Sequence, residues 1–503
     1  MTFPWLTFLG LVPLVGAAVL CLPVKQIARG VGMVFALATA LVGIGVAVLF
    51  SGGADLAEKA PWIPVFGAWW AVGLDGMSLV MVLLTVLLVP VVLLAEWKLP
   101  GRGRWTPQAF VALVLALESM SVFVFLAQDV LLFYLFFEAT LIPMYFLIGG
   151  FGGPRRSYAA VKFLLFSLAG GLVMLVSVIG LYAVSVQLTG APTYLLDELM
   201  KLQMDPMLAR WLMVGFLFAF VVKAPMVPVH TWLPTAAEEA TPGTSVLLVG
   251  ILDKIGTFGM IKFCLWLFPE ASTWVAPAMV VLALISILYG AVGAIGSKNL
   301  LRLVAYTSIS HFGFMVLGIY TFTSAGISGS IFYMVNHGFS TAALFLVIGF
   351  LISRRGSAMV TDFGGVQKLA PVLAGVFLMA GLSGLALPGM SSFVSEFMVL
   401  AGTWARQPGV AAVAVIGTVL AAVYILRMYQ RTMTGPVTED VARTFTTDAT
   451  AREKWVAAPI LAVILLLGFV PNLALSVIEP VAQTTMSHVG VTDPVAPLGE
   501  EAK

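Results

Sequence analysis

Apolar runs of about 20 residues, separated by short polar breaks, recur along the chain and constrain its fold more than any other feature. A helix of that length spans a hydrocarbon layer about 30 Å thick, because each residue advances about 1.5 Å. Charged residues make up 10% of the 503 residues, whereas soluble proteins average about 25%. The pattern predicts an all-α polytopic membrane protein with about fourteen transmembrane helices, at residues 4–22, 29–50, 76–97, 107–127, 129–150, 158–186, 211–230, 243–265, 274–294, 300–321, 327–352, 371–403, 408–430 and 455–478.

The segments outside these runs are expected to be linkers and a tail. Residues 51–75 and 187–210 are the longer linkers, with amphipathic pieces such as Leu195–Leu202. Residues 479–503 are polar, and we expect them to be extended. The first run, Pro4–Leu22, lacks a basic start and is read as a retained helix, although an uncleaved signal anchor has the same pattern.

The distribution of lysine and arginine predicts the orientation. With the N-terminus on the non-cytoplasmic side, the cytoplasmic loops carry 18 of the 26 basic residues and the opposite loops carry 5, including Lys503. Cytoplasmic loops are normally the more basic ones, and the bias supports an even number of spans. Three lysines fall within or near spans: Lys223, Lys254 and Lys262. Of these, Lys262 lies near the outer end of its span and is expected to snorkel, with its charged end in solvent.

Two predicted spans combine a buried charge with a proline break. Lys223 follows Trp211 by 12 residues, or about 18 Å of helix, and precedes Pro225 and Pro228. Glu396 follows the break at Pro388–Gly389. The two spans are five apart and so run in opposite directions, which is typical of inverted repeats. The sequence predicts helices 1–3 at 1–106, one repeat (helices 4–8) at 107–265, its inverted partner (helices 9–13) at 274–430, and the last helix with a polar tail at 431–503.

Several ionisable residues lie deep in apolar runs, where they are costly and usually functional. Glu138 stands near the middle of its run, and we expect it to pair with Lys223 because an isolated buried charge costs several kcal/mol. A static ion pair is the alternative. Lys254 is a second mid-span lysine, and its neighbour Asp253 points about 100° away around the helix. Glu118 is a further lone carboxylate at depth and a further candidate for proton transfer.

Three of the four histidines lie within the region of spans seven to eleven: His230, His311 and His337. The near-neutral pKa of histidine suits a proton relay, and a hydrogen-bonded core residue is the plainer alternative. Their spacing lacks the clusters that metal ligands need, so no metal site is expected. With Glu138, the lysines and Glu396, they predict a proton wire that runs partly parallel to the membrane, with gaps that water could bridge.

Other classes of function are disfavoured. The two cysteines, Cys21 and Cys264, are too few for an iron–sulfur ligand set. No strand precedes a glycine-rich phosphate-binding motif, so no nucleotide site is expected. The net charge of +2 indicates no nucleic-acid partner.

Five stretches resemble a known family, the antiporter-like membrane subunits of proton-pumping NADH–quinone oxidoreductase, or respiratory complex I. They are FFEATLIPMYFLIGGFGG, VKAPMVPVHTWLP, LLRLVAYTSISHFGF, MVNHGFSTAALF and LALPGMSSFVSEF, and the resemblance extends over about residues 70–480. Glu396 favours the subunit M (chain 4) group, since other groups usually carry lysine there. The length also fits that group, and the chain lacks the lateral helix typical of subunit L.

The resemblance implies a role for each matching residue. Glu138 and Lys223 would be the coupled pair, Lys254 the central relay and Glu396 the terminal site; Asp253 departs from the usual pattern. It also implies a bacterial inner-membrane location and partners among the other subunits of complex I, especially neighbouring antiporter-like subunits, in contact with the lipid bilayer, protons and water. No cofactor is expected on this chain, while FMN, iron–sulfur clusters, NADH and quinone belong to other subunits.

Two other functions stay open at this point. The same module occurs in multisubunit sodium/proton antiporters and membrane-bound hydrogenases, so the chain could be a component of either. It could also be a structural subunit whose buried charges only hold helices together. Partner subunits that co-purify would separate the first possibility from complex I, and double mutants that separate assembly from transport would test the second.

Overall fold

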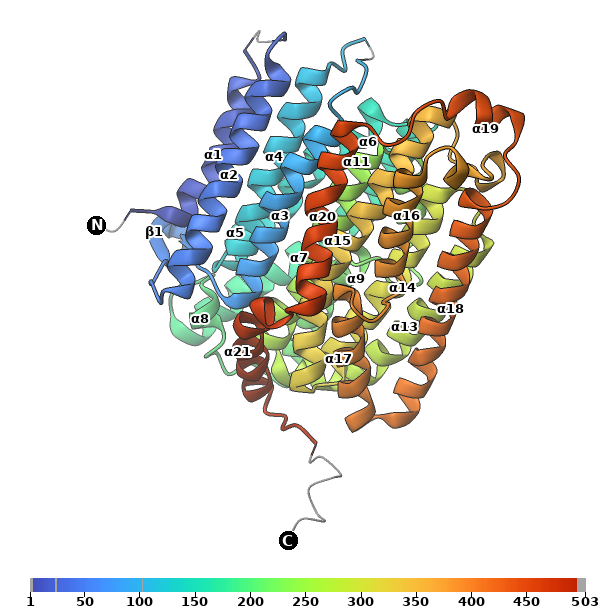
Figure 1. The fold of residues 1–503 in the computed structure, drawn as a ribbon. Coiled ribbons are helices and arrows are strands. Elements are labelled where there is room, and N and C mark those ends of the chain that lie inside the picture. The colour runs from blue at the N-terminus through green and yellow to red at the C-terminus, as the bar shows by residue number, and fades with distance from the viewer. Residues whose placement is uncertain (1–2, 23–24, 102, 495–503) are drawn as a thin grey trace.

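The computed structural model describes residues 3–22, 25–101 and 103–494, and Figure 1 shows a bundle of helices that run side by side. Arg102 and Lys503, which count in the charge bias, lie outside the described residues. The elements in chain order are α1 Trp5–Val19, α2 Ala28–Ser51, β1 Glu58–Ile63, η1 Pro64–Phe66, β2 Ala68–Val72, α3 Gly76–Ala95, α4 Pro107–Leu126, α5 Val130–Ala139, α6 Leu141–Phe151, α7 Arg156–Thr189, α8 Leu196–Leu199, α9 Pro206–Lys223, α10 Trp232–Glu239, α11 Pro242–Ser245, η2 Val246–Leu252, α12 Lys254–Gly259, η3 Met260–Leu265, α13 Pro269–Gly296, α14 Leu300–Tyr320, α15 Ser324–Arg355, η4 Val360–Asp362, η5 Val366–Lys368, α16 Pro371–Gly384, α17 Ser391–Arg406, α18 Pro408–Met433, α19 Glu439–Thr444, α20 Ala451–Phe469 and α21 Asn472–Val489.

The predicted membrane-spanning helical fold is confirmed. In the described part of the chain, ten helices are long and apolar enough to span a bilayer, with α5 and α6 together as one, or up to eleven if α20 and α21, which meet at 65°, form one span. Three predicted spans are shorter or interrupted. The span 4–22 contains the 15-residue α1, the span 243–265 is divided into α11, η2, α12 and η3, and the span 371–403 is divided into α16 and α17. The count of fourteen stays a prediction.

Both helices that the proline pattern predicted to be broken are broken. α9 ends at Lys223 and α10 begins at Trp232, with Pro225 and Pro228 between them. Proline lacks an N–H donor and clashes with the preceding turn, so a helix cannot continue through it undisturbed. α16 and α17 are separated by Leu385–Met390, a stretch in which Ala386 has φ 56° and Gly389 has φ 92°.

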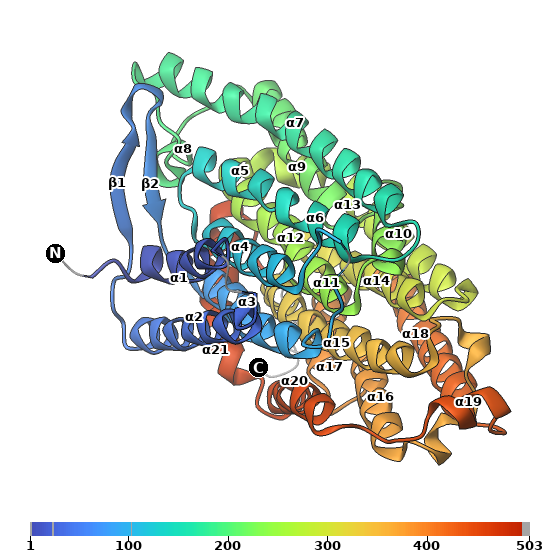
Figure 2. The same cartoon turned by 90° about the horizontal axis from the view of Figure 1, so that it is seen from above.

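The two ends of the bundle differ. One end, here called the basic end, carries Lys98 and Arg155 in loops and Arg354 in the last turn of α15. The other, the hairpin end, carries the β1–β2 hairpin, α8 and α21. The sequence pattern did not indicate the hairpin, an antiparallel pair that lies along one edge of the bundle (Figure 2). The expectation of an extended tail is wrong for residues 479–489, which belong to α21. Its amphipathic spacing buries Ile478, Ala482 and Met486.

The innermost helices are α14 and α15, in each of which 89% of the 18-residue apolar stretch is buried. By contrast, only 28% of the corresponding stretch of α2 and 33% of that of α18 is buried. Large apolar side chains on these two helices, such as Leu41 and Val419, are exposed. Such apolar exposure is stable only against lipid or another protein. The buried polar residues are concentrated on the innermost helices, so the functional candidates lie in the centre of the bundle.

Candidate functional site

Lys223 closes α9 at the first break. Its side chain is 1% exposed, and within the described residues its Nζ atom has no hydrogen-bond partner. Two aromatic faces surround the ammonium group instead, with Nζ 4.9 Å from the Phe137 ring centroid and 6.0 Å from that of Phe163. Cation–π contacts of this kind offset part of the cost of burial. The Trp232 indole N–H donates to the Val222 carbonyl at 3.1 Å and so ties α10 to the end of α9.

Glu138 lies in the last turn of α5, next to the aromatic ring that contacts Lys223. Its carboxylate is pressed against α7, since a Cβ atom built on Gly171 would lie 1.6 Å from Glu138 Oε1. Glu138 and Lys223 interact electrostatically. Neither Glu138 Oε1 nor Lys223 Nζ makes a hydrogen bond within the described part of the chain. The predicted partners are therefore neighbours across α5, α7 and α9, coupled through space rather than by direct contact.

Lys254 makes the contact that Lys223 lacks. It begins α12, between two π-helical segments, η2 and η3, in which the regular pattern of backbone hydrogen bonds is displaced. Lys254 Nζ donates to the Val249 carbonyl at 2.6 Å and lies 2.6 Å from Nδ1 of His337 on α15. Distorted helical turns of this type are frequent at functional sites. The sequence pattern indicated a regular helix here and gave no sign of the distortion.

Two of the three histidines predicted to form a relay lie next to each other. The rings of His337 and His311 meet edge to face with centroids 5.2 Å apart, and both residues are buried. His311 Nε2 then lies 3.5 Å from the hydroxyl of Tyr424 on α18. Its ring also lies 5.7 Å from the ring of Tyr333, measured between centroids.

Glu396 ends this line of side chains. The Tyr333 hydroxyl donates to Glu396 Oε2 at 2.8 Å, and the Thr418 hydroxyl donates to Oε1 at 2.5 Å. Titratable or hydroxyl-bearing groups thus follow one another from Lys254 through His337, His311 and Tyr333 to Glu396.

Sequence reasoning missed Tyr333, which belongs to this line, and Tyr424 and Thr418, which contact His311 and Glu396 beside it. Tyr333 precedes His337 by four residues, which places both on one face of α15, so an i,i+4 spacing was an available signal. Tyr424 and Thr418 come from α18, which is apolar and largely exposed elsewhere. Their place beside α14 and α17 depends on tertiary packing, which no local pattern in the sequence reports.

Two predicted residues lie off this line. His230 lies in the break after α9, where its ring contacts that of Tyr289 with centroids 4.8 Å apart. It interacts electrostatically with Lys162, near the basic end. Glu118 is buried in α4, and neither of its carboxylate oxygens has a hydrogen-bond partner among the described residues. The structure therefore does not join either residue to Lys254 or Glu396.

Lys262 corrects the expectation of a snorkelling side chain. Its side chain is 2% exposed, and its Nζ atom forms an ion pair with Asp75 at 2.6 Å. It also lies 4.3 Å from the Trp266 ring centroid. Asp75 is the N-cap of α3, where its other oxygen accepts the Ser78 N–H at 2.7 Å. A lysine that is predicted to reach solvent is instead held between α3 and η3.

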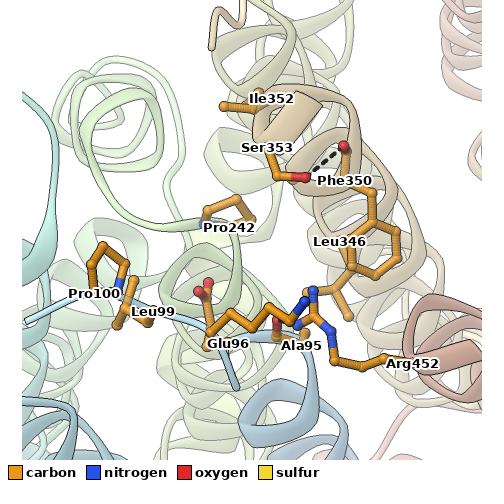
Figure 3. Close-up of a pocket in the computed structure, with 12 residues that line it drawn as sticks. Ala95, Glu96, Leu99, Pro100, Pro242, Leu346, Phe350, Ile352, Ser353 and Arg452 are labelled. Carbon is orange, nitrogen blue, oxygen red and sulfur yellow. Dashed lines mark hydrogen bonds between the residues drawn. The ribbon is translucent and has the colours of Figure 1, made fainter. Parts of the chain in front are cut away.

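A cavity of about 350 Å³ opens at the basic end, between the end of α3, the start of α11, α15 and α20. Figure 3 shows Glu96 and Arg452 on one side of it and Ser353 on the other. The Gly243 N–H donates to Glu96 Oε1 at 2.7 Å, so this carboxylate holds the start of α11. Burial raises the pKa of Glu96 above its ordinary value, against the opposing effect of its hydrogen bonds and of Arg452.

No group of three or more histidine, cysteine, aspartate or glutamate side chains is arranged to hold a metal ion in the part of the chain that the structure describes. The line from Lys254 to Glu396 consists of side chains that can each bind a proton or donate and accept a hydrogen bond. Such an arrangement can move a proton laterally through the centre of the bundle.

Comparison with known proteins gives concordant results. Residues 127–421 match the family described as NADH:quinone oxidoreductase/Mrp antiporter, TM. The chain is 48% identical to NADH-quinone oxidoreductase subunit M of Mycobacterium tuberculosis (strain ATCC 25618 / H37Rv), over 98% of this chain and 95% of the relative. Its structure is similar to a chain of respiratory complex I from Thermus thermophilus with bound NADH, with a TM-score of 0.87, 31% identity and coverage of 96% and 100%. A chain of the Mrp complex from Dietzia sp. DQ12-45-1b shares the fold, with a TM-score of 0.84, 24% identity and coverage of 97% and 100%.

Proposed function

The chain belongs to the NADH-quinone oxidoreductase subunit M family, and we propose that it carries protons across the membrane as an antiporter-like subunit of a complex I. The observation that carries this proposal is the line of side chains from Lys254 to Glu396. Each member can hold a proton or pass one through a hydroxyl group. A subunit that only held helices together would not need titratable side chains in such succession through its centre.

The proposed pathway adds Glu138 and Lys223 to this line, and its contacts are uneven along its length, which suggests where it is controlled. From Lys254 to His337 and from Tyr333 to Glu396 the groups are within hydrogen-bonding distance. Between Glu138 and Lys223 the interaction acts through space. A shift of Glu138 relative to Lys223 would change how strongly this lysine holds its proton, because the energy of two charges depends on their separation. Lys223 would then release a proton toward Lys254, and from there it would pass toward Glu396.

The remaining parts of the reaction would lie on other subunits. FMN, the iron–sulfur clusters, NADH and quinone would be bound there, in keeping with the two isolated cysteines of this chain. As a subunit of a redox-driven translocase, this chain would contact neighbouring antiporter-like membrane subunits. The excess of lysine and arginine supports an orientation with the basic end in the cytoplasm of a bacterium and the hairpin end outside.

Alanine substitution of Lys223 or Glu138 tests the proposal in the assembled complex. Reconstituted into sealed vesicles, each variant is expected to lose most NADH-driven proton uptake, while NADH oxidation by an artificial acceptor reports the amount of assembled complex. Uptake in sodium-free buffer separates proton translocation from sodium/proton antiport. Unchanged proton uptake per electron in both variants would exclude the pair from the pathway.

A further inference from the structure

Asp253 is a buried acid that the pathway described so far does not use. It directly precedes Lys254, where η2 meets α12. Its side chain is 0% exposed, and neither carboxylate oxygen has a hydrogen-bond partner in the described part of the chain. A buried carboxylate in this state is costly, and an ionisable residue buried in a membrane segment usually has a function.

The backbone places Asp253 on the side of α12 that faces Lys223. Gly256, three residues further along, packs directly against the end of α9: a Cβ atom built on it would lie 2.5 Å from the Ala224 nitrogen and 2.6 Å from the Phe220 carbonyl oxygen. Residues three apart share a helix face, and Asp253 itself has helical backbone angles. Asp253 is therefore directed toward the end of α9, which is Lys223.

The two lysines use different sides of this segment. Lys254 Nζ turns toward α15, where it contacts His337 and the Val249 carbonyl. Asp253 interacts electrostatically with both Lys254 and Lys223. It is thus an acid that interacts with both bases, at the step from Lys223 to Lys254, where no hydrogen bond joins the two lysines in the described part of the chain. The titratable groups on elements packed against this segment include Lys223 on α9, His337 and Tyr333 on α15, His311 and Tyr320 on α14, Glu118 on α4, and Lys262 and Cys264 on η3.

We propose that Asp253 is a further proton-carrying residue, which exchanges a proton with Lys223 on one side and with Lys254 on the other. A proton leaves the Lys223 ammonium for the carboxylate and gives a neutral amine and a carboxylic acid. The acid then protonates the neutral amine of Lys254, which restores the carboxylate and forms an ammonium group. One proton moves and the total charge is unchanged. This inference rests on the proposed function, since it concerns the same pathway.

The test uses the assembled complex with Asp253→Asn, which keeps the size of the side chain but cannot carry the proton, and Asp253→Glu, which keeps the acid. Asp197→Asn, at an exposed aspartate of α8, is the matched control. We expect proton uptake per NADH to fall about tenfold or more in Asp253→Asn, as for loss of an acid–base group, with Asp253→Glu close to wild type. Uptake that is unchanged in Asp253→Asn, or lowered equally in both variants, overturns the inference.

A second measurement decides the case if Asp253→Asn does not assemble. The infrared difference spectrum between oxidised and NADH-reduced complex should contain a carboxylic acid band that shifts in Asp253→Glu, and an unshifted spectrum overturns the inference. Lys223→Ala and Lys254→Ala are measured alongside. If they lose uptake and Asp253→Asn does not, only the role of Asp253 fails. If they too retain full uptake, the proposed function fails.

Discussion

Lys254 Nζ lies 2.6 Å from His337 Nδ1, and both side chains are fully buried. This contact joins a helix with π-helical distortion, η2 to η3, to the long, regular α15. It couples two groups that both titrate, so a proton on one changes the affinity of the other for its own proton. In the proposed pathway, this contact joins the central lysine, Lys254, to the neighbouring pair His337 and His311.

Replacement of His337 by glutamine should interrupt the line after Lys254. Glutamine can accept the hydrogen bond of Lys254 but cannot take up a proton. We expect NADH-driven proton uptake to fall by about tenfold or more, which is typical for removal of an acid–base group. The dye-quenching assay in vesicles measures this, normalised to assembled complex. Wild-type uptake in His337→Gln would place the proton path elsewhere.

The two tyrosines beside His311 should be partly redundant. Tyr333→Phe removes a hydrogen bond to the Glu396 carboxylate, worth about 1.5–3 kcal/mol, and Tyr424→Phe removes the hydroxyl that lies 3.5 Å from His311 Nε2. Each single variant should lower proton uptake less than the double variant does. Tyr320→Phe is the control, because the Tyr320 hydroxyl is buried with no hydrogen-bond partner among the described residues. A double variant no worse than the milder single variant would argue against two routes.

Gly171→Ala should displace Glu138 without removing its charge. The added Cβ atom would lie 1.6 Å from Glu138 Oε1, and the flexible carboxylate is the part that yields. Proton uptake should therefore fall although Glu138 and Lys223 are both present. Gly375→Ala on α16 is the matched control, since a Cβ atom there meets nothing within 4 Å. If both variants pump equally well, the position of Glu138 does not control the lysine.

The Lys262–Asp75 ion pair should stabilise the fold rather than carry protons. Asp75→Asn retains an oxygen for the Ser78 N–H but leaves the buried ammonium unpaired, at a cost of about 3–5 kcal/mol. We expect a lower melting temperature of the detergent-solubilised complex. Asp75→Asn combined with Lys262→Met should recover most of the loss, because no buried charge is then left alone. A double variant as unstable as the single one would contradict this account.

Most residues of the proposed pathway could be named from the sequence because charge in an apolar run is conspicuous. Lys223, Lys254, Glu138 and Glu396 were recognisable from depth alone, and the breaks beside Lys223 and Glu396 followed from proline. Tyr333 and Thr418 could not be recognised in this way, since tyrosine and threonine are common within apolar helices. Their significance depends on which helices become neighbours, and the hydropathy pattern does not contain that information.

The misjudged segments have a related cause. In the sequence, Lys262 looks like an isolated charge near a helix end, because its partner Asp75 is 187 residues away along the chain. The hairpin and α21 were missed because the segments that form them resemble linkers in composition. The division into two inverted repeats rests on the break positions and stays a prediction.

α15 is a single helix of 32 residues without a break, and it carries both Tyr333 and His337. Its rise of about 1.5 Å per residue holds their attachment points about 6 Å apart along the axis. In the proposed pathway, α15 thus holds Tyr333 and His337 at a constant spacing along the helix axis. Control of the proposed pathway would then act through rotation of the rings on α15 or through displacement at the broken helices, α9–α10 and α16–α17, and not through the spacing along α15.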